Sequence, residues 1–105
     1  MAFDCLELEA AKAFEWDRGN RYKNEKKHGL HWSEIEEIFF NQPLLIYEDL
    51  KHSQTECRCF ALGKTDEGKP LFVVFTLRSG KIRVISARQM NRKERSIYES
   101  YPGVQ

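Results

Sequence analysis

The 105-residue sequence lacks the features that mark several protein classes. It contains three cysteines, and the pair Cys57 and Cys59, taken together with His28, His31 and His52, matches no standard zinc-binding spacing. Apolar runs stay far short of the roughly 20 residues that a membrane span requires. The first residues are acidic where a signal peptide carries positive charge. We therefore expect a cytoplasmic protein that uses no metal and no cofactor and does not enter a membrane.

Repeats, low-complexity segments and linkers are also missing, and the composition that remains is that of one globular domain. Hydrophobic residues make up 41% of the chain and charged residues 31%, which is typical of a folded protein. A chain of this length supplies one hydrophobic core and is too short for two.

Charge is almost balanced over the whole chain, at +1, but it is unevenly distributed. Residues 1–57 carry a net charge of −5, and residues 58–105 carry +6. The stretch 78–95 alone holds seven basic residues against one acid, Glu94. Because affinity for nucleic acids comes largely from Lys and Arg side chains that displace counterions, this stretch predicts a phosphate-binding surface.

Capping signals predict three helices. Asp17 is a suitable N-cap for a helix over residues 18–28, which Gly29 ends in the left-handed conformation. A capping box from Ser33 to Glu36 starts a second helix, which stops at residues 41–43. A third helix follows the Asn91 cap, with Glu94 completing another capping box.

Apolar and alternating segments predict five short strands. They are Phe14–Trp16, Leu44–Tyr47, Arg58–Thr65, Pro70–Arg78 and Lys81–Arg88. The last three are joined by short turns, which indicates an antiparallel meander. The predicted fold class is α+β, an antiparallel sheet with helices packed mainly on one face.

A two-residue turn at Ser79-Gly80 fixes the expected register of the last two strands. The expected core-side pairs are Leu77/Ile82, Phe75/Val84 and Val73/Ser86, and the pairs on the other face are Arg78/Lys81, Thr76/Arg83, Val74/Ile85 and Phe72/Ala87. On this register Arg88 turns with Ser86 to the core side, away from Arg83. Parity likewise places Arg58 on the core side, where a rim ion pair is the favoured role.

Five short motifs resemble one known family. They are F-E-W-D at 14–17, N-x-x-K-H-G at 24–29, F-V-V-F-T-x-R at 72–78, I-R-V-I-S-A-R at 82–88 and E-R-x-x-Y at 94–98. In this order and spacing they resemble the BrnT toxin family over about residues 14–101. The family usually begins close to F-E-W-D, so residues 1–13 are predicted to be an N-terminal extension and residues 14–105 a single BrnT-like domain.

The resemblance implies a RelE-like fold and ribonuclease activity that cleaves messenger RNA and arrests growth. It also implies neutralisation by a BrnA-like antitoxin that carries a ribbon-helix-helix DNA-binding domain. The toxin and antitoxin are expected to form a heterotetramer, and contact with promoter DNA is expected only through the antitoxin.

Cleavage of RNA without a metal needs a general base, cations that stabilise the charged transition state, and a general acid. Arg83 is the first catalytic candidate because a strand holds its guanidinium rigidly on the basic face, opposite Thr76, a second candidate. The alternative is an exposed arginine paired with an acid such as Glu48. His28 is the acid–base candidate, and its alternative role is to complement the dipole at the end of its helix.

Four further cations are candidates for binding RNA: Arg78, Lys81, Arg88 and Lys93. Arg88 and Lys93 flank a helix N-terminus, which itself favours anions. The alternative is a basic helix start that is merely solvated. An exposed Tyr22 or Tyr47 is a candidate for stacking on an unpaired base.

The sequence therefore predicts the toxin of a type II toxin–antitoxin system, a metal-independent endoribonuclease. The alternative is a catalytically silent BrnT-like module that acts as antitoxin partner and co-repressor.

Overall fold

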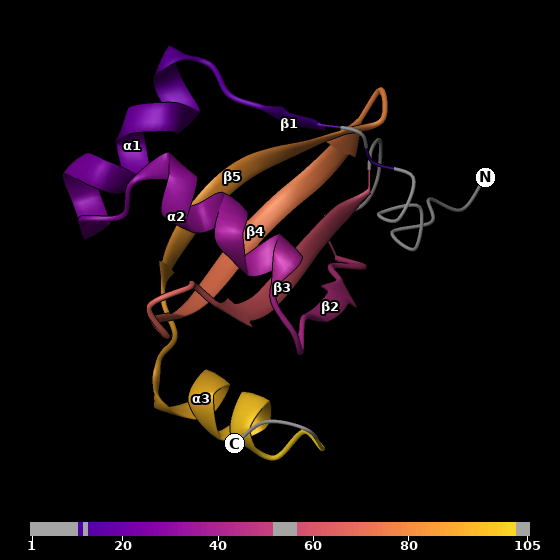
Figure 1. The fold of residues 1–105 in the computed structure, drawn as a ribbon. Helices are drawn as coiled ribbons and strands as arrows, with labels where there is room; N and C mark the ends of the chain where they lie inside the picture. Colours follow the sequence, from indigo (N-terminus) through magenta and orange to yellow (C-terminus); the bar gives the residue numbers. More distant parts are fainter. Residues whose placement is uncertain (1–10, 12, 52–56, 103–105) are drawn as a thin grey trace.

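The computed structural model describes residues 11, 13–51 and 57–102, which form one mixed sheet and its surrounding helices (Figure 1). The elements are β1 (Ala13–Glu15), α1 (Arg18–His28), α2 (Trp32–Glu37), the 3-10 helix η2 (Ile38–Phe40), β2 (Leu45–Glu48), β3 (Arg58–Lys64), β4 (Pro70–Arg78), β5 (Lys81–Gln89) and α3 (Arg92–Glu99). The strand order is β1-β5-β4-β3-β2. The predicted α+β class is confirmed, but the sheet is mixed because β1 runs parallel to β5.

The sheet begins within the predicted N-terminal extension, since Ala13 is the first residue of β1. Residues 1–10 and 12 of that extension, and His52, lie outside the described residues. No helix in the described part of the chain has the length and apolar character to cross a membrane.

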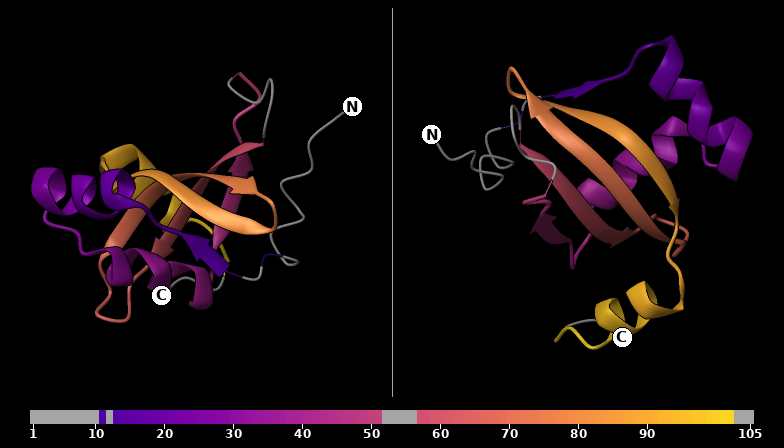
Figure 2. Two further views of the ribbon diagram at one scale, coloured as in Figure 1. Left: turned by 90° about the horizontal axis from the view of Figure 1, so that it is seen from above. Right: turned by 180° about the vertical axis from the view of Figure 1, so that it is seen from behind.

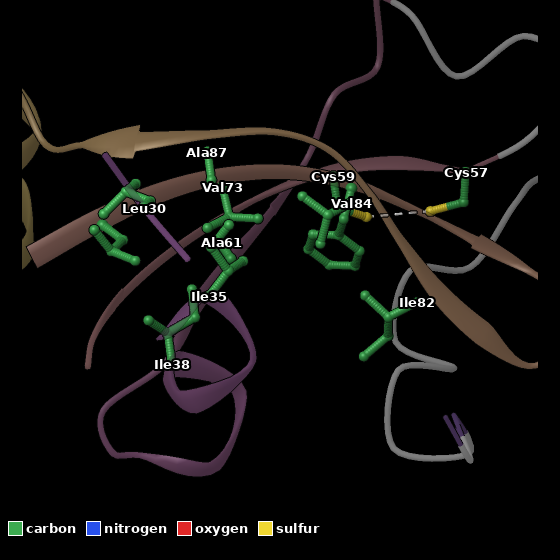
Figure 3. Packing of buried hydrophobic residues seen from close by; sticks show 12 residues of the cluster. Leu30, Ile35, Ile38, Cys57, Cys59, Ala61, Val73, Ile82, Val84 and Ala87 are labelled. Carbon is green, nitrogen blue, oxygen red and sulfur yellow. Dashed lines mark hydrogen bonds between the residues drawn. The ribbon is translucent and has the colours of Figure 1, made fainter. Parts of the chain in front are cut away.

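The main hydrophobic core lies between α2 and one face of the sheet (Figure 3). Ile35 and Ile38 are fully buried and pack against Ala61 and Val73 of the central strands. The Sγ atoms of Cys57 and Cys59 lie 3.2 Å apart at the far end of the same core. A smaller cluster on the opposite face joins α3 to the sheet, and its members are Leu45, Leu62, Met90 and Tyr98. Helices therefore contact both faces of the sheet.

The Ser79-Gly80 turn has the two positive φ angles, 52° and 75°, that a tight two-residue hairpin turn requires. It sets the predicted register from Arg78/Lys81 as far as Phe75/Val84. Between Val74 and Phe75 the register then shifts, so that Ile85 of β5 has no opposite partner. This bulge was not expected from the sequence.

Beyond the bulge the predicted pairs are wrong by one residue. Val74 lies opposite Ser86, Val73 opposite Ala87, and Phe72 opposite Arg88. The shift brings Ala87, which is 1% exposed, into the core in place of a serine whose hydroxyl would need a partner there. It also moves Arg88 onto the same face as Arg83, which is a correction to the predicted arrangement. Arg58 also lies on that face, because it pairs with Thr76.

Helix α1 attaches to the edge of β5 through polar side chains. Strand β1 pairs with β5 only as far as Arg83. From there, the Asn20 amide donates to the carbonyl of Val84 at 3.0 Å, and the Asn24 carbonyl oxygen accepts from the N–H of Ala87 at 3.0 Å. Because Asn20 and Asn24 are both buried, this face of α1 substitutes for a neighbouring strand.

The helix caps agree with the sequence except at α2. Asp17 and Gly29 cap α1 as predicted, and Asn91 caps α3. The N-cap of α2 is His31 rather than Ser33, because the His31 ring accepts from the Ser33 N–H and Glu34 accepts from the His31 N–H. Histidine is an unusual cap, so the more common serine cap is what the sequence pattern predicted.

Substitution Asn24→Ala is expected to lower the free energy of unfolding by about 1–3 kcal/mol, because it leaves the buried N–H of Ala87 without an acceptor. Urea denaturation of the variant and the wild type measures this change. The control is Glu25→Ala, an exposed neighbour on the same helix, which should change stability by less than about 0.5 kcal/mol. Equal stabilities of Asn24→Ala and the control would contradict the role of Asn24.

Stability should fall in acid as Glu34 is protonated. A hydrogen bond from Lys69, at 2.8 Å, lowers the pKa of Glu34 below its ordinary value of 4.5. A lowered folded-state pKa means that Glu34 stabilises the fold above pH 4.5, and that this contribution is lost as the pH falls through the folded-state pKa. Glu34→Gln should therefore show a weaker decline in stability below pH 4.5 than the wild type, whereas the exposed control Glu25→Gln should follow the wild type.

Candidate nucleic-acid interface

The sheet face opposite α2 gathers the arginines of three strands. Seen from that side, no helix of the described residues crosses the middle of the sheet, and α3 lies at one end (Figure 2, right). Strand pairing places five cations on this face: Arg58, Arg78, Lys81, Arg83 and Arg88. We refer to these five side chains as the basic face.

Arg83 lies at the centre of an ion-pair network. Its Nη1 is 3.2 Å from Oε1 of Glu15 in the adjacent β1, and its Nη2 is 2.5 Å from Oδ2 of Asp17. The hydrogen bond with Asp17 raises the pKa of Arg83, so its guanidinium stays charged. The pKa of Asp17 is lowered because its carboxylate accepts hydrogen bonds, first from the backbone N–H of Asn20 and second from the Arg83 guanidinium. The sequence left an ion pair with an acid such as Glu48 as the alternative role, and the acids that pair with Arg83 are instead Glu15 and Asp17.

The turn end of the basic face carries the other two predicted RNA-binding residues of the hairpin. Arg78 lies 3.7 Å from Glu15, which therefore contacts two arginines. Lys81 is exposed beside the turn. The structure thus brings Arg78, Lys81 and Arg83 together, as the hairpin register predicted.

Arg88 forms the second anchored group on the basic face. Its guanidinium makes a bidentate contact with Glu94 at 2.7 and 2.9 Å and stacks 4.4 Å from the centre of the Phe72 ring. Burial raises the pKa of Glu94, but hydrogen bonds from Arg88 and the Asn91 N–H outweigh burial, so the net pKa is lowered. Arg88 therefore fixes the start of α3 and is already paired with a carboxylate. Lys93, in the first turn of α3, is exposed.

Arg58 has the rim ion pair that the sequence favoured, although it lies on the other face of the sheet from the one predicted. Its Nε is 3.8 Å from Oδ2 of Asp49. With Arg78, Arg83 and Arg88 also paired, the basic face is close to neutral despite its many cations. A phosphate that binds to these arginines must displace or share their carboxylates.

Thr76 lies directly opposite Arg83 but is buried, and His28 lies at the far end of α1. Thr76 is 1% exposed, and its hydroxyl donates to the carbonyl of Cys57 at 2.6 Å, so burial argues against contact with a substrate. His28 ends α1, whereas Arg83 contacts the cap at its start. A helix of 11 residues separates these ends by about 15 Å, so the structure does not bring His28 next to Arg83, and its acid–base role stays a prediction.

Aromatic side chains lie next to the basic face. Tyr47 is 45% exposed on the edge strand β2 and pairs with Phe60, whose ring centre is 5.4 Å from that of Phe72. Tyr22, the other predicted stacking residue, is 51% exposed on α1. Sequence reasoning missed Phe60, and it also missed Glu15 and Asp17 as the partners of Arg83. The alternation of residues in β3 places Phe60 on the same face as Arg58, so the sequence contained a signal for it. No local pattern indicated the ion pairs of Arg83 with Glu15 and Asp17.

Comparison with known proteins identifies the family. No curated protein matches the sequence. The family described as the ribonuclease toxin BrnT of type II toxin–antitoxin systems matches residues 16–94, which include α1, the whole β2–β5 meander and the first turn of α3. The match covers most of the chain and contains all seven predicted site residues. The chain therefore belongs to the BrnT family of ribonuclease toxins of type II toxin–antitoxin systems.

Proposed function

We propose that this protein is an endoribonuclease that cleaves messenger RNA on the basic face and thereby arrests growth. The observation that carries the proposal is the position of Arg83, mid-strand on a sheet face whose middle no described helix covers, with its guanidinium bound to carboxylates in the way it would bind a phosphate. A carboxylate and a phosphodiester present similar pairs of anionic oxygens to an arginine. The family supports the ribonuclease activity.

In the proposed reaction the 2′-oxygen of the RNA attacks the adjacent phosphorus, and the bond from phosphorus to the 5′-oxygen breaks. The 2′-hydroxyl loses its proton to a base, and the 5′-oxygen gains one from an acid. Arg83 stabilises the negative charge that develops on the phosphate oxygens, which is a role that needs no metal. Arg78 and Lys81 bind the neighbouring backbone, and Lys93 extends the cationic surface at the start of α3.

Placement in a toxin–antitoxin system implies a partner. The proposed partner is a BrnA-like antitoxin with a ribbon-helix-helix domain, which would assemble with the toxin as a heterotetramer in the cytoplasm. Promoter DNA would be contacted by the antitoxin.

One observation favours the second candidate function, a catalytically silent antitoxin partner and co-repressor. Four of the five cations of the basic face are already paired with carboxylates. Arginines paired in this way are common on folded surfaces where they have only a structural role.

Expression of the chain without any antitoxin separates the two functions. The wild type should stop growth and fragment cellular RNA, and Arg83→Ala should abolish both effects because the transition-state charge loses its guanidinium. Lys51→Ala is the matched control, since it removes an exposed cation after β2, at the opposite edge of the sheet. Growth rate and RNA integrity are measured at equal soluble expression.

Normal growth and intact RNA with soluble wild-type protein would exclude the nuclease and favour the silent partner. An Arg83→Ala variant as toxic as the wild type would exclude only Arg83 as the catalytic residue.

Asp17→Asn tests whether phosphate competes with carboxylate at Arg83. Asparagine is also a good N-cap, so α1 should remain intact while Arg83 loses an anionic partner. Affinity for a short single-stranded RNA with blocked 2′-hydroxyls should rise roughly two- to fivefold. Glu67→Gln, which removes an exposed charge from the β3–β4 loop, serves as the control for net charge. An affinity of Asp17→Asn no higher than that of this control would argue against binding at Arg83.

A further inference from the structure

A groove lies between α1 and β5, beside the Arg83 ion pairs. Its volume is about 350 Å³, and its lining residues are Asp17, Gly19, Asn20, Lys23, Arg83, Val84 and Ile85. The groove is distinct from the sheet face, because it follows the outer edge of β5 where β1 has ended.

The bulge and a glycine create this groove. The bulge at Ile85 turns a backbone carbonyl toward α1, where the Lys23 ammonium donates to it at 3.2 Å. Gly19 places no side chain in the groove, and a Cβ there would come within 3.3 Å of Oδ1 of Asp17. The groove therefore stays open next to a cation that the bulge holds in place.

Lys23 differs from the arginines of the basic face in that it forms no ion pair with a carboxylate of the described residues. Its hydrogen bond goes to a neutral carbonyl, and its side chain is exposed. An ammonium has three N–H donors, so two remain for a ligand. The rest of α1 adds to the positive potential, because besides Lys23 the helix has four Lys and Arg residues against one acid, Glu25.

The helix N-terminus itself is not the anion-binding group here. The Asp17 side chain already accepts from the N–H of Asn20 at 2.8 Å and occupies the cap position. The attraction for an anion in this groove comes from Lys23 and from Arg83. Arg83 lies at the end of the groove that adjoins the basic face.

We propose that this groove binds a backbone phosphate of single-stranded RNA, adjacent to the phosphate held by Arg83. The RNA chain then passes from the basic face over the corner between β1 and α1 and continues along α1. The inference rests on the proposed nuclease function and extends it with a phosphate subsite outside the cleavage position. The ligand is RNA because Arg83 belongs to both surfaces, so one continuous polyanion can occupy them together.

The experiment measures binding of a short single-stranded RNA with blocked 2′-hydroxyls, which cannot be cleaved, over a series of salt concentrations. Lys23→Ala should weaken binding roughly three- to tenfold and reduce the slope of log affinity against log salt by about 0.7, the value for one phosphate contact on a single strand. Lys23→Arg should have the affinity and the salt slope of the wild type, because arginine keeps the positive charge and the N–H donors. Lys51→Ala is the matched control and should leave both unchanged.

Three readouts make the result decisive. Wild-type affinity and salt slope in Lys23→Ala, alongside weakened binding by Arg83→Ala, would overturn the groove and leave the proposed nuclease intact. Failure of the wild type to bind RNA at all would overturn the groove together with the proposed function. Binding of polyglutamate that depends on Lys23 as strongly as RNA binding does would overturn RNA as the ligand and point to an acidic protein segment.

Discussion

The attachment of α1 to β5 is the interaction on which the rest of the structure depends. Strand β5 is the second strand of the sheet, yet β1 covers only its first part. The remaining backbone groups would be left without partners if Asn20 and Asn24 did not bond to them. By fixing α1 at this edge, the same contacts place Asp17 against Arg83 and Lys23 against the bulge. The ion-pair network and the groove both follow from this docking.

This docking also explains why α1 has so little apolar surface. A helix that packs on a sheet normally buries a hydrophobic stripe. The inward positions of α1 are instead asparagines, and their burial is stable because three of their four side-chain polar groups are hydrogen-bonded. Short-range sequence patterns do not distinguish such a helix from a solvent-exposed one.

Local signals in the sequence predicted the helices and strands well, but they predicted poorly how residues far apart in the chain pair with one another. The bounds of α1 and β4 and the caps at Asp17 and Asn91 match the prediction, because capping and turn chemistry depend on residues close together in the chain. The bulge at Ile85 was missed because counting alternate residues assumes an unbroken strand, and one extra residue reverses every side chain beyond it. This error affected the candidate site, because the sequence prediction placed Arg88 on the core face, whereas it lies on the same face as Arg83. The parallel pairing of β1, and with it the partners Glu15 and Asp17, depends on contacts more than 60 residues apart that no short pattern reports.

The pairing of the basic face with its own carboxylates has a consequence for the kinetics of binding. A surface of bare arginines produces a long-range field that captures any polyanion rapidly and with little discrimination. Here Glu15, Asp17, Asp49 and Glu94 cancel most of that field, so approach to the face receives little electrostatic acceleration. Only a ligand whose anionic oxygens fit the guanidinium groups can replace the carboxylates after contact. If RNA binds to this face as proposed, the network selects it by shape at close range and limits unproductive association with DNA and other polyanions.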